Sequence, residues 1–232
     1  MHVTAHLDVD LIALESDDSV TCLLQLQAPV LPTDQARPGQ TLVVVLDRSG
    51  SMSGTPLNTA KDALRQLTRR LAPHDRFGLV VFDESAQVIV PVRTMLGHDP
   101  VVVDALIAGI RPGGSTDLWA GYDLALREAT RSLQSTSADP DIVDAATVVL
   151  VSDGHANAGI TDPDQLRQRA LVEYKNAAIT SLTIGLGLGY DEVLLAAISD
   201  GGSGAHRFAA NADELPTVLA DEVTGLLDKS VL

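Results

Sequence analysis

Two continuous apolar runs, Thr41–Leu46 and Ala146–Val151, constrain most strongly what this chain can fold into. Neither run alternates with polar residues, as a strand with one face in water would. Such runs are typical of strands that are buried on both faces of a parallel sheet. Parallel strands need long, usually helical crossovers to connect them, so we expect helices between the runs.

The segments between these runs show helical periodicity. Leu57, Ala60, Leu64, Leu67 and Leu71 recur at spacings of three and four residues, which marks one face of a helix. The pattern then predicts strands at 76–82, 86–92, 179–185 and 207–208, and helices at 100–110, 118–133, 162–174, 191–199 and 212–227. The alternation predicts an α/β fold: a doubly wound, mostly parallel sheet with helices on both faces. A hairpin between the strands at 76–82 and 86–92 predicts one antiparallel edge strand.

The first forty residues follow a different pattern. Val3–Leu11 and Val20–Leu26 alternate apolar with polar residues, which predicts an N-terminal β-hairpin extension. Pro29, Pro32 and Pro38 then indicate a linker. We therefore expect residues 1–40 to be a β-strand extension and linker from a larger β-module, and residues 41–229 to be the main domain. An uncovered apolar face on such strands invites association, so one expectation is a homodimer formed through them.

Charge and cysteine content exclude several classes of function. Lys and Arg number 16 against 31 Asp and Glu, a net charge of −15, which predicts no binding of nucleic acid. A single cysteine, Cys22, excludes an intramolecular disulfide and a Cys-rich zinc site. The chain has no leader-like start, no run of membrane-spanning length and no P-loop pattern. We therefore expect a cytoplasmic protein without membrane insertion.

Three polar, glycine-containing loops should project at one end of the sheet. One follows each apolar run, at 47–54 and at 152–155, and the third precedes the predicted helix at 118–133. In open doubly wound sheets the functional crevice lies outside the carboxyl ends of the strands. The loops supply five side chains that bear oxygen atoms: Asp47, Ser49, Ser51, Thr116 and Asp153.

Oxygen ligands of this kind suit Mg²⁺, with Mn²⁺ or Ca²⁺ as alternatives, rather than zinc or copper. The Asp-x-Ser-x-Ser spacing places three of them on one side of a tight turn. Two carboxylates and three hydroxyls do not fill and neutralise the coordination sphere by themselves. We therefore expect some contacts through water and one position open to an anionic oxygen. A Glu or Asp carboxylate of a protein partner is the simplest such ligand.

The order of these motifs resembles the von Willebrand factor type A (VWA) domain with a metal-ion-dependent adhesion site (MIDAS). Its pattern of Asp-x-Ser-x-Ser, a distant Thr and a distant Asp is matched by Asp47-Arg48-Ser49-Gly50-Ser51, Thr116 and Asp153. The resemblance covers residues 41–227. It implies a Rossmann-like VWA fold in which the two serines bind the metal directly. It also implies that the threonine binds the metal when a ligand is engaged, and that the aspartates bind it directly or through water.

The first forty residues resemble the β extension of bacterial proteins whose VWA domain is spliced into a β-rich module. The resemblance implies that the chain is a fragment, or a compact member that lost further β-structure.

Two functions stay open. The first is a non-enzymatic, metal-dependent protein–protein interaction module in which the ion binds an acidic residue of the partner. The second is a metal-dependent hydrolase or phosphatase that uses ion-activated water. A hydrolase needs a positioned base and usually a second metal or a cationic clamp. His155 is the only candidate base and Arg48 the only cation within the loops, so we favour the first function.

Neighbouring residues receive structural interpretations. We expect Asp83 and Glu84 to form a solvated hairpin tip. We expect Asp117 to be a charge at the start of a helix rather than a metal ligand. For Trp119 we favour helix packing, with a contact to a partner as the alternative. His206 shares no spacing with the other histidines outside the loops and is left without a functional role.

Overall fold

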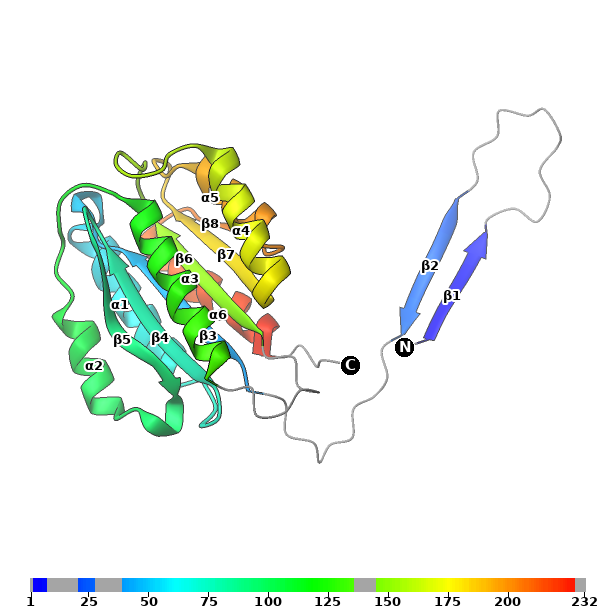
Figure 1. Cartoon of the computed structure of the whole chain (residues 1–232), viewed down its shortest axis with the longest axis horizontal. Coiled ribbons are helices and arrows are strands. Elements are labelled where there is room, and N and C mark those ends of the chain that lie inside the picture. The colour runs from blue at the N-terminus through cyan, green and yellow to red at the C-terminus, as the bar shows by residue number, and fades with distance from the viewer. Residues whose placement is uncertain (1, 8–20, 28–38, 136–144, 228–232) are drawn as a thin grey trace. The chain divides into compact units, whose positions relative to one another are not determined.

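The computed structural model describes residues 2–7, 21–27, 39–135 and 145–227 (Figure 1). The chain divides into two compact units, residues 1–37 and 38–232. In the first unit, β1 (His2–Leu7) and β2 (Cys22–Gln27) pair antiparallel, with Ala5 opposite Leu24. This confirms the N-terminal hairpin. Residues 8–11 of the first predicted strand and the linker prolines lie outside the described residues.

The second unit contains a six-stranded sheet with the order β5-β4-β3-β6-β7-β8. β5 runs antiparallel to β4, and the other neighbouring strands run parallel. This confirms the predicted α/β fold with one antiparallel edge strand. The strands are β3 (Thr41–Asp47), β4 (Arg76–Phe82), β5 (Ala86–Thr94), β6 (Ala146–Ser152), β7 (Ile179–Leu186) and β8 (His206–Ala209).

Helices cover both faces of this sheet (Figure 1). One face carries α1 (Thr55–Thr68), α2 (Pro100–Gly109) and α6 (Leu215–Leu227), and the other carries α3 (Leu118–Gln134), α4 (Pro163–Ala177) and α5 (Glu192–Gly201). Single 3₁₀ turns lie at η1 (Gly50–Met52), η2 (Met95–Gly97) and η3 (Ala212–Glu214). None of the helices in the described part of the chain combines the length and apolarity needed to cross a membrane.

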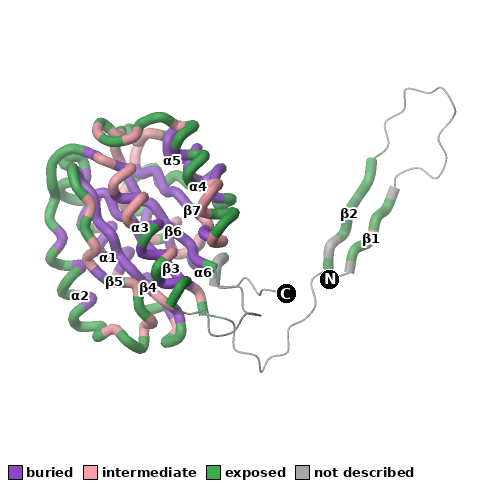
Figure 2. The backbone as a smooth tube through the Cα atoms, viewed as in Figure 1, coloured by how far each residue is buried: buried purple, intermediate pink, exposed green. Residues whose placement is uncertain are grey.

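The continuous apolar runs serve two separate hydrophobic cores. In β3, Leu42, Val44 and Leu46 pack on the side of α1 and α6, whereas Val43 and Val45 pack on the side of α3. All seven residues of β3 are buried, and the central strands are buried along their length in Figure 2. A strand between two helical layers needs apolar residues at every position, which is why polar alternation is missing.

Aspartates define the starts of four helices. Each accepts a backbone N–H from the first turn and so satisfies one of the donors that a helix start leaves unpaired. They are Asp99 before α2, Asp117 before α3, Asp162 before α4 and Asp191 before α5.

The order of the strands places a topological switch point at the end of β3. The chain leaves β3 towards β4 on one side and reaches β6 on the other, so the direction of winding reverses between β3 and β6. Ligand sites of open α/β sheets lie at such switch points, outside the carboxyl ends of the strands. Asp47 is the last residue of β3 and Ser152 the last of β6.

Both ring nitrogens of His206, on β8, have hydrogen-bond partners. Thr183 donates its hydroxyl hydrogen to the Leu195 carbonyl at 3.0 Å, so its oxygen accepts from His206 Nδ1 at 2.9 Å. The other ring nitrogen, Nε2, can then accept from the Tyr190 hydroxyl at 3.0 Å. Burial lowers the pKa of His206 below its ordinary 6.5, and the negative charges of Glu192 and Asp200 oppose this shift only in part.

We expect this histidine to make the protein less stable as the pH falls from about 7 to 5. The unfolded chain binds the proton at a higher pH than the folded chain, so stability is present above the unfolded pKa and declines below it. Urea unfolding of wild type and His206→Gln at both pH values measures the effect, and the variant should show a smaller decline. Equal declines in the two proteins would contradict this assignment.

Candidate metal-binding site

Asp47 is fully buried at the end of β3. Its Oδ1 accepts the backbone N–H of Ser49 at 2.7 Å, and its Oδ2 accepts the hydroxyl of Ser152 at 2.5 Å. Burial raises the pKa of the Asp47 carboxyl, and the hydrogen bonds from Ser152 and Ser49 oppose that rise. The first loop therefore begins in an Asx turn whose carboxylate is held in one orientation.

Two serine hydroxyls connect this loop to the end of β6. Ser49 Oγ lies 3.1 Å from Ser51 Oγ, and Ser51 Oγ donates to Asp153 Oδ1 at 2.7 Å. Burial raises the pKa of Asp153, and the charge of Asp153 adds to the rise in the pKa of Asp47. The two carboxylates are therefore near enough to repel each other.

Thr116 reaches the same cluster from the loop before α3. A Cβ atom added to Gly154 would lie 3.3 Å from Ser51 Oγ and 3.9 Å from Thr116 Oγ1, so both hydroxyls face the Gly154 backbone. Asn157 fixes the threonine, because its Oδ1 accepts the Thr116 N–H at 2.9 Å while its own N–H donates to the Thr116 carbonyl at 3.1 Å. The structure thus brings together the five side chains predicted as ligands.

The chemistry of this cluster fits a hard divalent cation. Within the described ranges, no group of three or more His, Cys, Asp or Glu side chains could hold a metal, and here two carboxylates meet three hydroxyls instead. Arg48, the one basic residue of the first loop, turns to Asp83, with Nη2 2.9 Å from Oδ2. Buried carboxylates whose pKa is raised by burial and by each other gain stability from a cation between them.

Asp83 is one of three residues whose roles the sequence did not predict, with Ser152 beside Asp47 and Asn157 beside Thr116. The prediction of a solvated tip is wrong for Asp83, which is 5% exposed, and correct for the exposed Glu84. Besides its ion pair with Arg48, Asp83 accepts the N–H of Asp117 on its carbonyl at 2.7 Å. A Cβ atom on Gly113 would lie 2.0 Å from Asp83 Oδ2, so this approach requires glycine. That glycine, three residues before Thr116, is the sequence signal that could have revealed the contact.

The contacts of Asp117 and Trp119 agree with the structural roles predicted for them. Asp117 is the N-cap of α3 and accepts the N–H of Ala120 at 2.9 Å. Trp119 is half-buried and packs against the core, with its ring centroid 6.5 Å from that of Tyr122. His155 is exposed, and its Nδ1 lies 3.4 Å from Asp191 Oδ2.

Known proteins resemble this chain in sequence and in fold. Among curated proteins, YfbK of Escherichia coli (strain K12) is 27% identical over 192 residues, which cover 82% of this chain and 32% of YfbK. The chain therefore spans about a third of that relative's length.

Solved structures share the fold at lower identity. A von Willebrand factor type A structure from Catenulispora acidiphila matches with a TM-score of 0.70 at 20% identity, covering 84% of this chain and 44% of that one. Proximal thread matrix protein 1 from the mussel byssus, with a zinc-occupied MIDAS motif, matches with a TM-score of 0.63 at 18% identity, covering 82% and 46%. The sequence profile described as von Willebrand factor type A domain matches residues 41–221. Because that match takes in most of the chain, the chain belongs to the von Willebrand factor type A domain family.

Proposed function

We propose that this chain is a metal-dependent protein–protein interaction module. VWA domains commonly mediate protein interactions. The observation that supports a role for metal here is the convergence of five oxygen-bearing side chains at the switch point of the sheet. We propose as ligands Asp47, Ser49, Ser51, Thr116 and Asp153.

A divalent cation bound there would supply a positive charge that attracts a Glu or Asp carboxylate of the partner. The role of the protein is to hold the ligands in place. Asp47 is oriented by two hydrogen bonds, and Ser51 connects the first loop to Asp153. We propose Mg²⁺ as the ion, with Mn²⁺ or Ca²⁺ as alternatives, and the zinc-occupied site of the mussel protein adds Zn²⁺ to the ions to be tested.

A hydrolase remains the alternative, and the surroundings of the cluster support it less. Ion-assisted hydrolysis needs a base that can take a proton from the attacking water. His155 is the histidine of these loops, and its Nδ1 faces Asp191. A homodimer through β1 and β2, where Val3 and Leu24 are exposed, remains a prediction, as does a cytoplasmic location.

We expect Mg²⁺ to raise the melting temperature of the protein, because an ion that binds only the folded state stabilises it. At ten times its dissociation constant the gain is about 1.4 kcal/mol. Thermal melts in EDTA and in about 5 mM Mg²⁺, Mn²⁺, Ca²⁺ or Zn²⁺ measure the effect and rank the ions. Identical melting temperatures in all five conditions would contradict the metal site.

A further inference from the structure

We propose that a groove beside the metal-site loops selects the partner. It would accept an apolar side chain from a segment whose acidic residue binds the ion and whose basic residue meets the acidic rim of the groove. This inference rests on the proposed function, because the same segment must occupy both places.

The groove has a volume of about 780 Å³ and lies between α3, α4 and the loop that follows β6. The two helices are neighbours on one face of the sheet (Figure 1). Trp119, Ile160 and Val172 form its apolar wall, and Asp162 and Asp164 lie along its rim. Clefts of 300–1,000 Å³, mainly apolar with a few placed polar groups, are the usual form of binding sites.

The walls of this groove are attached to the metal-site loops. Trp119 follows Thr116 by three residues, and the loop that carries Ile160 is hydrogen-bonded to the main chain of Thr116. In that loop Gly159 has a φ of +71° and packs on Asp117, where an added Cβ atom would lie 2.1 Å from Oδ1. The groove therefore begins three residues after Thr116, and hydrogen bonds join its second wall to the same loop.

The basic group of the groove is already paired. Arg169 Nη2 lies 3.5 Å from Glu173 Oε1 and 3.8 Å from Asp123 Oδ1. Asp123 also pairs with Arg127, so two arginines and two carboxylates balance one another and leave little attraction for an acidic partner residue at this place.

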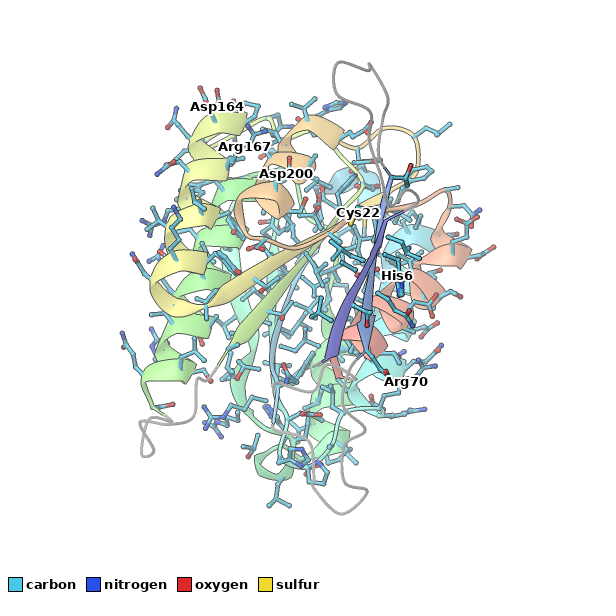
Figure 3. The ribbon with its side chains drawn as sticks, turned by 90° about the vertical axis from the view of Figure 1, so that its right-hand side faces the viewer. His6, Cys22, Arg70, Asp164, Arg167 and Asp200 are labelled. Carbon is cyan, nitrogen blue, oxygen red and sulfur yellow. The ribbon has the colours of Figure 1, made fainter. Side chains whose placement is uncertain are left out.

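The acidic groups of the rim are more available. The side chain of Asp164 is 91% exposed, and its Oδ1 is 3.6 Å from Arg167 Nη1. The other terminal nitrogen of Arg167, Nη2, lies 4.0 Å from Asp200 Oδ2 (Figure 3). Such surface ion pairs are weak and exchange readily. At Asp162, the hydrogen bond from the backbone of Gln165 lowers the pKa of the carboxyl, so it stays ionised at neutral pH.

These features define the partner segment. The ion selects a carboxylate, the wall of Trp119, Ile160 and Val172 selects Leu, Met or Phe, and the rim selects Lys or Arg. A strongly acidic segment would bind the ion equally well but would be repelled by the rim, within a chain that carries a net charge of −15.

Trp119 is the single tryptophan of the chain, so its fluorescence reports on the groove. The probe is a synthetic pentapeptide with blocked ends. It has glutamate at position 1, leucine at position 3, lysine at position 5 and glycine at the two positions between them. A second peptide has the same residues in reversed order. Three further peptides replace the glutamate by glutamine, the leucine by serine or the lysine by glutamine. Each is titrated in Mg²⁺ and in EDTA, following Trp119 emission and, independently, calorimetric heat.

In Mg²⁺ we expect the parent peptide to shift Trp119 emission to shorter wavelength. The serine peptide should bind about tenfold more weakly or worse, because it loses a buried leucine side chain. Val172→Lys, or Val172→Ser if the lysine variant does not fold, should weaken the parent peptide to a similar extent. Tyr174→Lys is the matched control, because Tyr174 is an exposed residue of the same helix outside the groove.

The rim is tested by charge. Asp164→Asn should reduce the preference for the lysine peptide over its glutamine form. The control Asp62→Asn removes an exposed aspartate on α1 and should leave that preference unchanged.

Two outcomes separate this inference from the proposed function. If binding requires Mg²⁺ and the peptide's glutamate, but is unchanged by replacing the peptide's leucine or by Val172→Lys in the protein, the proposed role of the groove is wrong and the metal-dependent function stands. Affinity that requires leucine but persists in EDTA would retain the groove and contradict the metal-dependent function. Absence of binding by both peptide orders up to about 10 mM would overturn the inference.

Discussion

Asp153→Ala is expected to eliminate the rise in melting temperature produced by Mg²⁺, and to weaken Mg²⁺ binding by more than about 100-fold. Loss of groups that only support metal ligands costs about 10–100-fold, so loss of a ligand should cost more. In the absence of metal, the variant should melt within about 2 °C of wild type. Asp153 is half-buried and accepts a hydrogen bond from the Ser51 hydroxyl. In the variant, a water molecule can accept that hydrogen bond instead. Calorimetric titration and thermal melts measure both quantities.

Two comparisons sharpen this test. Asp200→Ala removes a charge of the same sign from an exposed position and should leave the Mg²⁺ effect unchanged. Asp47→Ala should abolish the Mg²⁺ effect and also lower the metal-free melting temperature, because Ser152 and the Ser49 N–H lose a buried acceptor. A normal Mg²⁺ effect in Asp153→Ala would mean that the ion binds elsewhere.

Phe82→Ala is expected to reduce the free energy of unfolding by about 3–5 kcal/mol, the second large effect. Phe82 is fully buried at the end of β4, and its ring faces Gly121 of α3. A Cβ atom on Gly121 would lie 2.5 Å from that ring, so Gly121→Ala alone should destabilise the protein by about 1–3 kcal/mol through overpacking.

The double variant provides the critical measurement. Phe82→Ala removes the two ring atoms nearest to position 121, at 2.5 and 2.6 Å, and keeps the Cβ of residue 82 at 2.9 Å. Most of the overpacking is then relieved, so the combined loss should be smaller than the sum of the single losses by about 0.5–3 kcal/mol. Urea unfolding of the four proteins gives this difference. Gly109→Ala on α2 is the control, because no atom outside the backbone of its own helix and its chain neighbours lies within 4 Å of the added Cβ, and it should be near neutral. Strict additivity would show that α3 does not depend on this close approach.

The sequence predicted the sheet well because its strongest signals are local. Val43 and Val45 face one core while Val44 faces the other, and a run without polar alternation is the direct sign of that arrangement. The convergence of Ser51, Thr116 and Asp153 was predictable for a related reason. The carboxyl ends of parallel strands meet at one edge, whatever the length of chain between them.

Features that depend on contacts between distant elements were not predictable in the same way. The burial of Asp83 depends on how closely the loop containing Gly113 approaches it. The groove depends on the separation of α3 and α4, and its walls come from Trp119, Ile160 and Val172, which share no periodicity along the chain. The predicted helix at 212–227 divides into η3 and α6, next to Pro216, whose nitrogen has no hydrogen to donate.

The two edge strands of the six-stranded sheet, β5 and β8, are poor templates for the addition of another strand. β5 carries an exposed proline, Pro91, which cannot donate a ladder hydrogen bond, and β8 extends over only four residues. Long, regular edge strands can pair with strands of other chains and so form intermolecular sheets. This unit can therefore be crowded into an assembly at high local concentration without its copies joining edge to edge.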